Sequence, residues 1–364
     1  MMHVVISGYY GFDNVGDEAI LYSIIRTLKE IQPDIKITVL SNNPEKTSYT
    51  YHVHSVNRRN IVAIRKAIKE SDGLISGGGS LLQDITGPMS IPYYTGVIQL
   101  AKWHRKPVFI YAQGMGPINR KFSKLIVRMT LNKTDHITVR DDNSKSLLKL
   151  LGVKLDARLA PDPVLGLDSS TFISPWMESQ DISNSIISVS VRHWKEYTSF
   201  KPKIARSLDH LVQNGNTVIF VPMHGLHDHH ASEEVASLME EKCLISPHDA
   251  TIQEKIALIG KSQLLIGMRL HSLIFSAINA TPFIAISYDP KIDSFAEIYN
   301  QPVIGDVTAT SWGEKELVEK VKWILERSEE HETYIKQKLK ICKEEAMETA
   351  LGAIRTIRAS AKVN

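Results

Sequence analysis

The first half of the chain alternates short apolar runs with longer amphipathic stretches. The short runs predict β-strands at 3–7, 35–40, 73–76, 108–112 and 137–140. Apolar residues recur with the spacing of a helix face at 18–31, 61–70, 94–104, 119–131 and 143–151. Because strands that alternate with helices form parallel βαβ units, this pattern predicts a doubly wound α/β sheet.

The periodicity breaks at 161–184, where three prolines occur, and then resumes. Further strands are predicted at 186–191, 217–221, 243–245, 264–266 and 283–286, and the chain is helical and mixed in charge from about residue 314 to 361. We therefore expect two Rossmann-like α/β domains facing a cleft, a GT-B-like architecture, with a C-terminal helix. The expected divisions are an N-terminal domain at 1–165, a linker at 166–184, a C-terminal domain at 185–330 and a helical segment at 331–364.

Composition narrows the class of protein. Of 364 residues, 43% are hydrophobic, which is enough for two domain cores. Cys243 and Cys342 lack metal-ligand spacing, as expected in a reducing cytosol. No apolar run approaches the roughly 20 residues that span a bilayer, and the chain enters a strand at its start, so we expect no signal peptide. A net charge of +3 argues against a dedicated nucleic-acid binder.

The segment 264–273, Leu-Leu-Ile-Gly-Met-Arg-Leu-His-Ser-Leu, carries the clearest functional pattern. A buried strand leads into a helix that opens with Arg269, Leu270, His271 and Ser272. These residues are expected at the carboxyl end of a strand, where open α/β sheets place their ligands. Arginine binds carboxylate or phosphate, and histidine can transfer a proton near neutral pH, so the pair suits an anionic substrate that must be protonated. The alternative is a plain helix start with a surface arginine and a capping histidine.

A glycine-rich loop at 8–18 follows the first predicted strand. Glycines allow backbone N–H groups to approach a ligand closely, but the spacing is not that of a dinucleotide-binding loop. Asp17 and Glu18 fit helix capping as well as ligand binding. The ligand candidates in this loop are Asp13, Asn14 and Gly16.

A second glycine-rich loop, at 77–84, begins with three consecutive glycines after a predicted strand. Such a nest can hold phosphate, here through Gly78 and Gly79, while Asp84 could accept hydrogen bonds from sugar hydroxyls. The Walker lysine is missing, so the loop does not belong to a nucleotide triphosphatase. The alternative is a tight crossing of strand and helix, which explains at least one glycine.

Histidines and arginines follow three more predicted strands. Four histidines crowd the segment 224–230, but zinc ligands usually come from separated segments with defined spacing, so we expect no metal here. His224, nearest the strand, is the ligand candidate. Arg140 and Arg192 each end a strand and are expected to bind an anion. A structural ion pair is the alternative, above all for Arg140, which two aspartates follow.

In their order along the chain, these segments resemble the polysaccharide pyruvyl transferase family. The matching segments are 11–19, 77–79, 113–114, 139–141, 222–224 and the Arg-Leu-His of 269–271, with Tyr288 and Lys291. The nearest likeness is to CsaB-type enzymes, which pyruvylate secondary cell-wall polymers that anchor S-layers. The resemblance implies a GT-B-like fold, phosphoenolpyruvate as co-substrate and no cofactor. It also implies a lipid-diphosphate-linked oligosaccharide as acceptor, in which N-acetylmannosamine receives a 4,6-ketal of pyruvate.

The residues themselves agree with such chemistry. Phosphoenolpyruvate carries a carboxylate and a phosphate, so its site needs at least two cations. The N-terminal domain is expected to bind the acceptor and the C-terminal domain to bind phosphoenolpyruvate. Arg269 is expected to hold the donor, and His271 to protonate its methylene carbon and to accept a proton later. The alternative function is a GT-B glycosyltransferase that uses a nucleotide sugar, although no distinctive ribose-binding carboxylate occurs in the second half. Further substrate-binding candidates are Arg140, Arg192, His224 and Lys291.

The distribution of charge suggests where the protein works. Residues 85–134 contain lysines and arginines but no Asp or Glu, and Arg120, Lys124 and Arg128 share one face of the helix at 119–131. Each cation near an anionic membrane adds about 1 kcal/mol of attraction. We therefore expect a cytoplasmic protein that binds the inner face of the cell membrane peripherally. A second stripe is expected to pack into the domain core: Phe122, Leu125, Ile126 and Met129.

Overall fold

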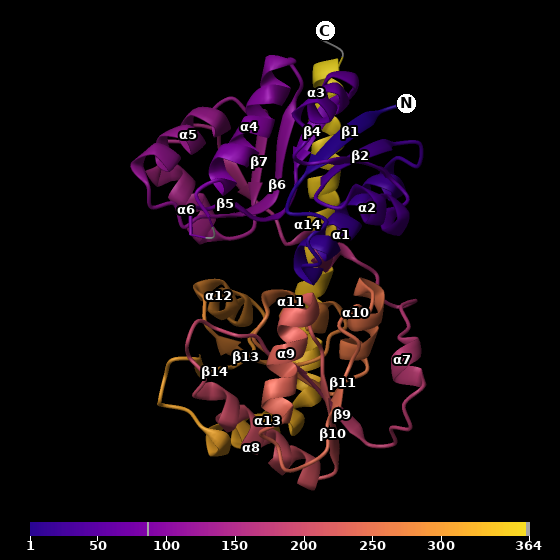
Figure 1. The fold of residues 1–364 in the computed structure, drawn as a ribbon, viewed down its shortest axis with the longest axis vertical. Coiled ribbons are helices and arrows are strands. Elements are labelled where there is room, and N and C mark those ends of the chain that lie inside the picture. The colour runs from indigo at the N-terminus through magenta and orange to yellow at the C-terminus, as the bar shows by residue number, and fades with distance from the viewer. Residues whose placement is uncertain (86, 362–364) are drawn as a thin grey trace. The chain divides into compact units, whose positions relative to one another are not determined.

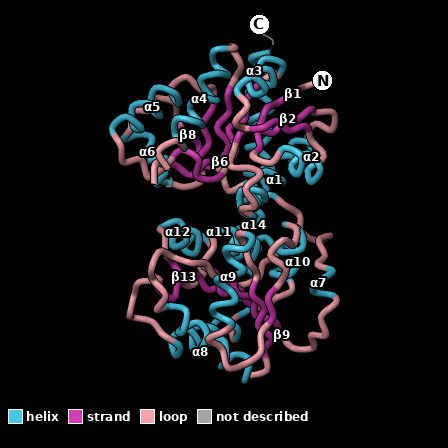
Figure 2. The backbone as a smooth tube through the Cα atoms, in the orientation of Figure 1, coloured by secondary structure: helices cyan, strands magenta, loops and turns pink. Residues whose placement is uncertain are grey.

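The computed structural model describes residues 1–85 and 87–361, and the chain forms two compact units. The first unit comprises residues 1–166 together with the end of the chain from Cys342. The second comprises residues 167–341. Each unit has one parallel sheet flanked by helices (Figure 1, Figure 2) and a hydrophobic core of its own.

The sheet of the first unit has the strand order β3-β2-β1-β4-β6-β7-β8, and a short strand, β5, pairs with the end of β6. All pairs are parallel. Since β1 pairs with β2 on one side and β4 on the other, the order reverses between β1 and β4. The strands are β1 (His3–Ser7), β2 (Lys36–Ser41), β3 (His54–Asn57), β4 (Gly73–Ser76), β5 (Gly79–Leu82), β6 (Val108–Met115), β7 (His136–Val139) and β8 (Ala157–Leu159).

Helices cover both faces of this sheet. Neighbouring residues of a strand point to opposite faces, and apolar residues on each face pack against helices. Ile110 packs with Ile98 and Val127 in the core of the unit. The preceding Phe109 contacts the C-terminal helix, where a Cβ added to Gly352 would lie 3.7 Å from its ring. The helices are α1 (Val15–Ile31), α2 (Pro44–Tyr51), α3 (Ile61–Glu70), α4 (Ser90–Trp103), α5 (Lys121–Leu131), α6 (Asp142–Leu150) and the short 3-10 helix η1 (Pro163–Gly166).

The sheet of the second unit has the strand order β11-β10-β9-β12-β13-β14, again parallel throughout. Its order reverses between β9 and β12. Both sheets therefore share one topology, in which the first strand of the unit lies at the point of reversal. The strands are β9 (Ser185–Ser190), β10 (Asn216–Phe220), β11 (Leu244–Ile245), β12 (Leu264–Gly267), β13 (Phe283–Ser287) and β14 (Val303–Asp306).

Two groups of helices accompany the second sheet. One group packs its apolar residues on Val189 and Ile266, with Ile204 of α8, Val235 of α9 and Val321 of α13 in the same core. In the other group α11 contacts both α10 and α12. The helices are α7 (Pro175–Glu178), α8 (Phe200–Gln213), α9 (Gly225–Ala236), α10 (Ile252–Gly260), α11 (Leu270–Ile278), α12 (Pro290–Ile298) and α13 (Glu314–Leu325).

The C-terminal helix α14 (Ser328–Ala361) belongs in part to each unit. In the second unit Nδ1 of His331 lies 3.1 Å from Nε2 of Gln301. In the first unit a Cβ at Gly73 would meet the side chain of Ile357 at 2.8 Å, so this glycine lets the helix approach β4. The predicted separate segment at 331–364 is thus divided between the units, and the stretch predicted as a linker, 166–184, lies almost wholly in the second unit.

No helix within residues 1–85 and 87–361 is both long and apolar enough to cross a bilayer. One amphipathic helix nevertheless exposes apolar side chains. On α5, Phe122 is 71% exposed, Leu125 42% and Met129 53%, so the prediction that this stripe packs into the core is wrong for these three residues. The face that packs into the unit instead carries Ser123, Val127, Thr130 and Leu131.

Candidate functional site

The carboxyl ends of four neighbouring strands in the second unit carry polar residues. In the order β10-β9-β12-β13, these strands are followed by His224, Arg192, Arg269 and Tyr288. Because the strands are parallel, all four residues lie at one edge of the sheet. The strand order reverses between β9 and β12, which is the place where open α/β sheets bind ligands.

Arg269 forms an ion pair with Asp228, whose side chain is buried, while the arginine side chain is 16% exposed. Its Nε donates to Oδ2 of Asp228 at 2.8 Å, and its Nη2 donates to Oδ1 of the same carboxylate. Asp228 lies in the first turn of α9, is 1% exposed and also accepts the backbone N–H of Met223 at 3.2 Å. The pair ties the start of α9 to the start of α11, since Arg269 is the N-cap residue of α11.

The contact with Asp228 determines which edge of the Arg269 guanidinium is left for a ligand. A guanidinium has five N–H groups in a planar fork, and Asp228 uses the edge formed by Nε and Nη2. The edge formed by Nη1 and the second N–H of Nη2 is not used by this contact. A carboxylate or phosphate can bind that edge through two parallel hydrogen bonds. Arg269 can therefore hold Asp228 and an anionic ligand at the same time.

Arg192 is held by neutral groups. Its Nη1 donates to the hydroxyl of Tyr288 at 3.0 Å and its Nε donates to the carbonyl of His193 at 3.2 Å. The guanidinium also lies 4.8 Å from the ring centre of Tyr288 and 5.3 Å from that of Trp194. None of the ion pairs between described residues involves Arg192, so its charge is available to an anion. Sequence analysis selected Arg192 but missed Trp194, which follows it in the same loop.

Histidines flank these arginines. His224 precedes α9, and its pKa is lowered, first by burial and then by the positive charge of Arg269, so the ring is neutral at pH 7. His271 is the second residue of α11 and is half-buried. The hydroxyl of Ser272 donates to the carbonyl of Arg269 at 2.6 Å, and Leu270 is buried, so both support the turn at the helix start.

Lys291 lies in the first turn of α12, after β13. Its Nζ is 3.1 Å from Oδ2 of Asp289, and its backbone N–H donates to Oδ1 of the same carboxylate. This predicted ligand therefore contributes a partly neutralised charge.

Arg140 lies in the first unit, at the end of β7, and is surrounded by protein groups. Its Nη2 donates to the hydroxyl of Ser80 at 2.9 Å, and its guanidinium lies 3.6 Å from Asp141 and 3.9 Å from Asp162. The side chain is only 10% exposed. A Cβ at Gly114 would come within 2.7 Å of the guanidinium, so that glycine makes room for it. These contacts match the alternative of a structural ion pair.

The loop after β4 is shaped by packing. A Cβ at Gly78 would lie 3.0 Å from Ile20, and one at Gly79, whose φ is +87°, would lie 2.7 Å from Asp17. Asp84 accepts the backbone N–H groups of Asn119 and Arg120 at 2.8–3.0 Å, at the start of α5. Burial alone would raise the pKa of Asp84, but these two N–H groups, the hydroxyl of Ser123 and the charge of Arg120 together hold the pKa below its ordinary value. The predicted sugar ligand thus has a capping role in the structure.

The loop after β1 is held by internal hydrogen bonds. Asn14 is the N-cap residue of α1, and its Oδ1 accepts the N–H of Gly16 at 3.2 Å. Glu18 accepts the N–H of Gly11 at 2.7 Å and the hydroxyl of Tyr51 at 2.6 Å, although burial raises the pKa of Glu18. Asp13 is exposed and pairs with Lys46 at 2.6 Å. Of the three ligand candidates in this loop, Asp13 is exposed, Asn14 is half-buried and Gly16 is buried.

The histidine-rich segment forms the start of α9. Nε2 of His229 lies 3.4 Å from Glu233, one turn further along, and the rings of His224 and His227 are 5.4 Å apart. Within the described part of the chain, no group of three His, Cys, Asp or Glu side chains is arranged to hold a metal ion.

Comparison with protein families gives one match over most of the chain. The model of the polysaccharide pyruvyl transferase family matches residues 14–290. Amylovoran biosynthesis protein AmsJ of Erwinia amylovora is 21% identical, in an alignment that covers 92% of this chain and 94% of that protein. The family match includes Arg192, His224, Arg269, His271 and Tyr288 of the strand-end site and ends one residue before Lys291.

Solved structures share the fold at low sequence identity. A UDP-GlcNAc 2-epimerase of Neisseria meningitidis has a TM-score of 0.69, 12% identity and coverage of 98% of this chain and 100% of that one. Anabaena Alr3699/HepE has a TM-score of 0.64, 12% identity and coverage of 99% and 100%. E. coli ADP-heptose LPS heptosyltransferase II has a TM-score of 0.53, 15% identity and coverage of 90% and 100%. These likenesses confirm the predicted α/β class with two Rossmann-like domains and a C-terminal helix.

Replacing Asp228 by Asn should lower the free energy of unfolding by about 3–5 kcal/mol, because a largely buried guanidinium then lacks its charged partner. Urea denaturation followed by circular dichroism measures this change. Asp13→Asn is the control, since it breaks an ion pair whose side chains are 61% and 66% exposed. That exposed pair should contribute no more than about 1 kcal/mol. Equal effects of the two substitutions would contradict the role assigned to the pair of Asp228 and Arg269.

Proposed function

The chain belongs to the polysaccharide pyruvyl transferase family, and we propose that its donor is phosphoenolpyruvate and its product a 4,6-ketal. Transfer of pyruvate to a polysaccharide follows from the family match and from the AmsJ relative. The proposed acceptor is a lipid-diphosphate-linked precursor of a cell-wall polysaccharide, in which N-acetylmannosamine receives the pyruvate. No cofactor or metal enters the proposed reaction.

The charges at the strand-end site carry this proposal. Phosphoenolpyruvate has a carboxylate and a phosphate, and each suits a planar guanidinium. Arg192 has no carboxylate partner among residues 1–85 and 87–361, and Arg269 keeps one edge of its guanidinium outside the contact with Asp228. Two arginines at adjacent strands, β9 and β12, thus match the two anionic groups of one small donor.

His271 supplies the proton in the proposed mechanism. Protonation of the donor's methylene carbon leaves a cationic carbon that carries the phosphate, and the first sugar hydroxyl attacks it and loses its proton. The phosphate then leaves, the second hydroxyl closes the ring, and its proton is taken up by a base. His271 first donates a proton and can afterwards accept one, as general acid–base catalysis requires. Inorganic phosphate and the ketal are the products.

The decisive experiment offers the protein phosphoenolpyruvate and a lipid-diphosphate disaccharide ending in N-acetylmannosamine. Release of phosphate together with a pyruvate-bearing product in the mass spectrum is expected. Thermal stabilisation by phosphoenolpyruvate, compared with UDP and UDP-sugars, separates this function from that of a nucleotide-sugar glycosyltransferase. Stabilisation by UDP-sugars alone, without consumption of phosphoenolpyruvate, would overturn the proposal.

His271→Gln should abolish turnover and preserve donor binding, because the amide keeps polarity but cannot transfer a proton near neutral pH. The expected loss in kcat is roughly 10²–10⁴-fold. Steady-state phosphate release gives the rate, and isothermal titration with phosphoenolpyruvate gives the affinity. His210→Gln, on the exposed end of α8, is the matched control. Near-normal turnover of the His271 variant would remove this residue from the catalytic role.

Arg192→Lys and Arg269→Lys should each weaken donor binding, although both keep the positive charge. Lysine presents a point charge where the guanidinium makes two parallel hydrogen bonds, so we expect a loss of roughly tenfold or more. Arg206→Lys provides the control, since Arg206 is an exposed residue of α8. Titration with phosphoenolpyruvate measures all three. An unchanged affinity in either strand-end variant would place that arginine outside the donor site.

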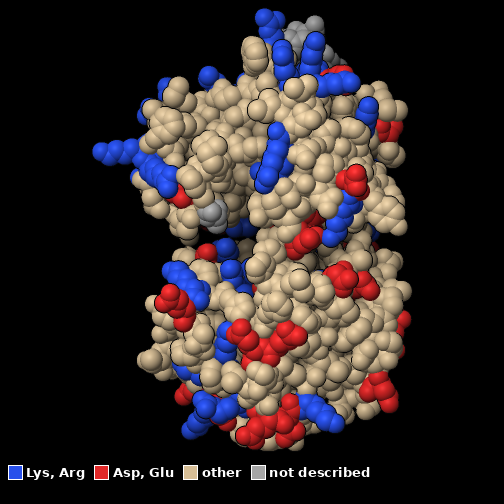
Figure 3. All heavy atoms as spheres, in the orientation of Figure 1, with Lys and Arg blue, Asp and Glu red and all other residues tan. Residues whose placement is uncertain are grey.

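The solvent face of α5 supports a peripheral membrane location for the proposed enzyme. The exposed Phe122, Leu125 and Met129 form a stripe along the helix, beside the exposed cations Lys124 and Arg128. Figure 3 shows blue lysine and arginine atoms projecting from the region of α5. A helix with adjacent apolar and cationic stripes suits an anionic bilayer, into which the apolar side chains can insert while the cations contact headgroups.

Replacing Phe122, Leu125 and Met129 together by serine should abolish binding to anionic liposomes. Replacing Arg120, Lys124 and Arg128 by glutamine should weaken binding and remove its dependence on salt. Co-sedimentation at low and high salt measures both, and Leu150→Ser, on the exposed end of α6, is the control. If the wild type stays in the supernatant at low salt, or self-associates through α5 in sedimentation velocity runs instead, the membrane proposal fails.

A further inference from the structure

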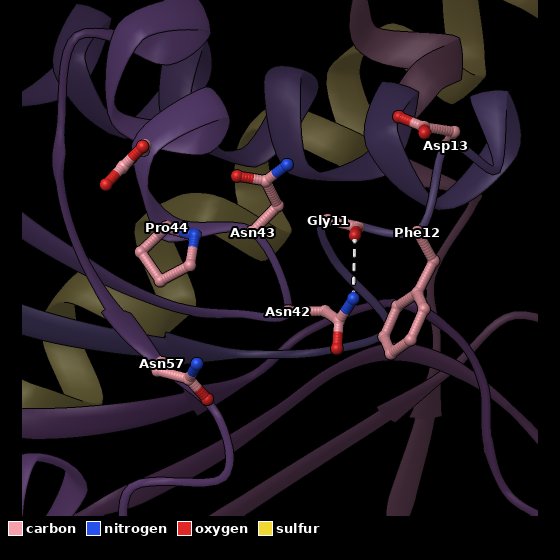
Figure 4. A pocket seen from close by; sticks show the side chains of 8 residues that line it. Gly11, Phe12, Asp13, Asn42, Asn43, Pro44 and Asn57 are labelled. Atoms are coloured by element: carbon pink, nitrogen blue, oxygen red, sulfur yellow. Dashed lines mark hydrogen bonds between the residues drawn. The ribbon is translucent and has the colours of Figure 1, made fainter.

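A polar pocket of about 620 Å³ opens in the first unit (Figure 4). Its size lies within the range of small-molecule sites in proteins. Three asparagine amides, two carboxylates and one aromatic ring line it: Asn42, Asn43, Asn57, Asp13, Glu45 and Phe12. Apart from Asp13, none of these side chains was a ligand candidate in the sequence.

Three neighbouring strands place the pocket at the ligand-binding edge of the sheet. β1 leads into the loop that carries Phe12 and Asp13, Asn42 follows the end of β2 directly, and Asn57 is the last residue of β3. These strands are adjacent and parallel, so their carboxyl ends meet at one edge. Open α/β sheets bind ligands outside that edge.

The walls of the pocket are held in place before any ligand arrives. The N–H of Asn42 donates to the carbonyl of Tyr10 at 3.0 Å, and its Nδ2 donates to the carbonyl of Gly11 at 3.4 Å. The ring of Phe12 stacks on that of Tyr9, with centroids 4.0 Å apart and planes 5° from parallel. A prearranged site loses less conformational freedom when it binds.

Two of the asparagines keep hydrogen-bond donors for a ligand. Oδ1 of Asn43 accepts the N–H of Lys46 at 3.2 Å, and Oδ1 of Asn57 accepts the N–H of Arg59 at 2.8 Å. Those contacts orient both amides and leave their amino groups without a protein acceptor among residues 1–85 and 87–361. Glu45, in the first turn of α2, adds a hydrogen-bond acceptor. The pocket therefore offers donors and acceptors close together.

We propose that this pocket binds a neutral sugar unit of the polysaccharide acceptor. A sugar hydroxyl both donates and accepts hydrogen bonds, which a mixture of amides and carboxylates satisfies. Phosphate is disfavoured, because the residues that line the pocket include the anionic Glu45 and Asp13 but no lysine or arginine. The nearby Lys46 pairs with Asp13 at 2.6 Å. The identification of the sugar with the acceptor rests on the proposed function, whereas its binding does not require phosphoenolpyruvate.

The test uses the full chain without donor. Protein labelled with 15N-asparagine is titrated with N-acetylmannosamine, N-acetylglucosamine and glucose at millimolar concentrations, and the side-chain amide signals are followed by NMR. Asn43→Asp and Asn57→Asp keep the oxygen that caps the backbone but lose the amino group. Asn60→Asp makes the same change at the N-cap of α3, where Oδ1 accepts the N–H of Ala63 at 3.0 Å, and serves as the matched control.

We expect at least one sugar to shift the signals of Asn43 and Asn57. Loss of one hydrogen bond should weaken its binding roughly threefold to tenfold in each pocket variant and leave the Asn60 variant unchanged. Failure of every sugar to shift these signals, or equal binding by all three variants, overturns the proposal. So does a response to pyrophosphate but to no sugar. Sugar binding without pyruvyl transfer would retain the pocket and reject the proposed function.

Discussion

The ion pair between Arg269 and Asp228 constrains the site more than any other contact. It joins the start of α9 to the start of α11, and these helices follow strands on either side of β9. Removing two charges from water costs several kcal/mol each, so the pair is stable only in a geometry that satisfies both partners. That requirement fixes the plane of the guanidinium and leaves one of its edges outside the contact with Asp228.

The two units share a strand order, but different side chains lie at the point where that order reverses. In the first unit the reversal between β1 and β4 is occupied by Tyr10, because a Cβ at Gly77 would lie 2.0 Å from its hydroxyl and one at Gly8 would lie 2.2 Å from its ring. Because Gly8 and Gly77 have no side chains, the buried ring of Tyr10 fits at this point. In the second unit the corresponding reversal, between β9 and β12, is flanked by Arg192 and Arg269. The arginines of the proposed anion site therefore lie at the reversal point of the second unit, whereas the polar pocket of the first unit lies towards β2 and β3.

Sequence patterns predicted the strands well, because buried parallel strands are continuous apolar runs; β1 and β4 have the predicted bounds. Sequence patterns did not predict which face of α5 is buried. The buried face carries mainly smaller residues such as Ser123 and Val127, and Phe122 is exposed to solvent. The role of Asp228 as the partner of Arg269 was not predicted. The two residues are 41 positions apart in the sequence, and no local pattern indicates such a contact. The backbone partners of Asp84 at 119–120 were also not predicted, since they are distant in the chain, and its role as a sugar ligand stays a prediction.

The balance of charge at the strand-end site is compatible with the highly anionic donor that we propose. Asp228 neutralises Arg269, Asp289 lies beside Lys291, and burial keeps His224 neutral, so Arg192 supplies most of the net positive charge. A bound anion would favour the charged form of His224, because an opposite charge nearby raises the pKa of a histidine. The free site thus holds little unpaired charge in a partly buried region. Such a site favours ligands that bring their own negative charge, whereas the pocket that we propose for a neutral sugar presents amides and carboxylates.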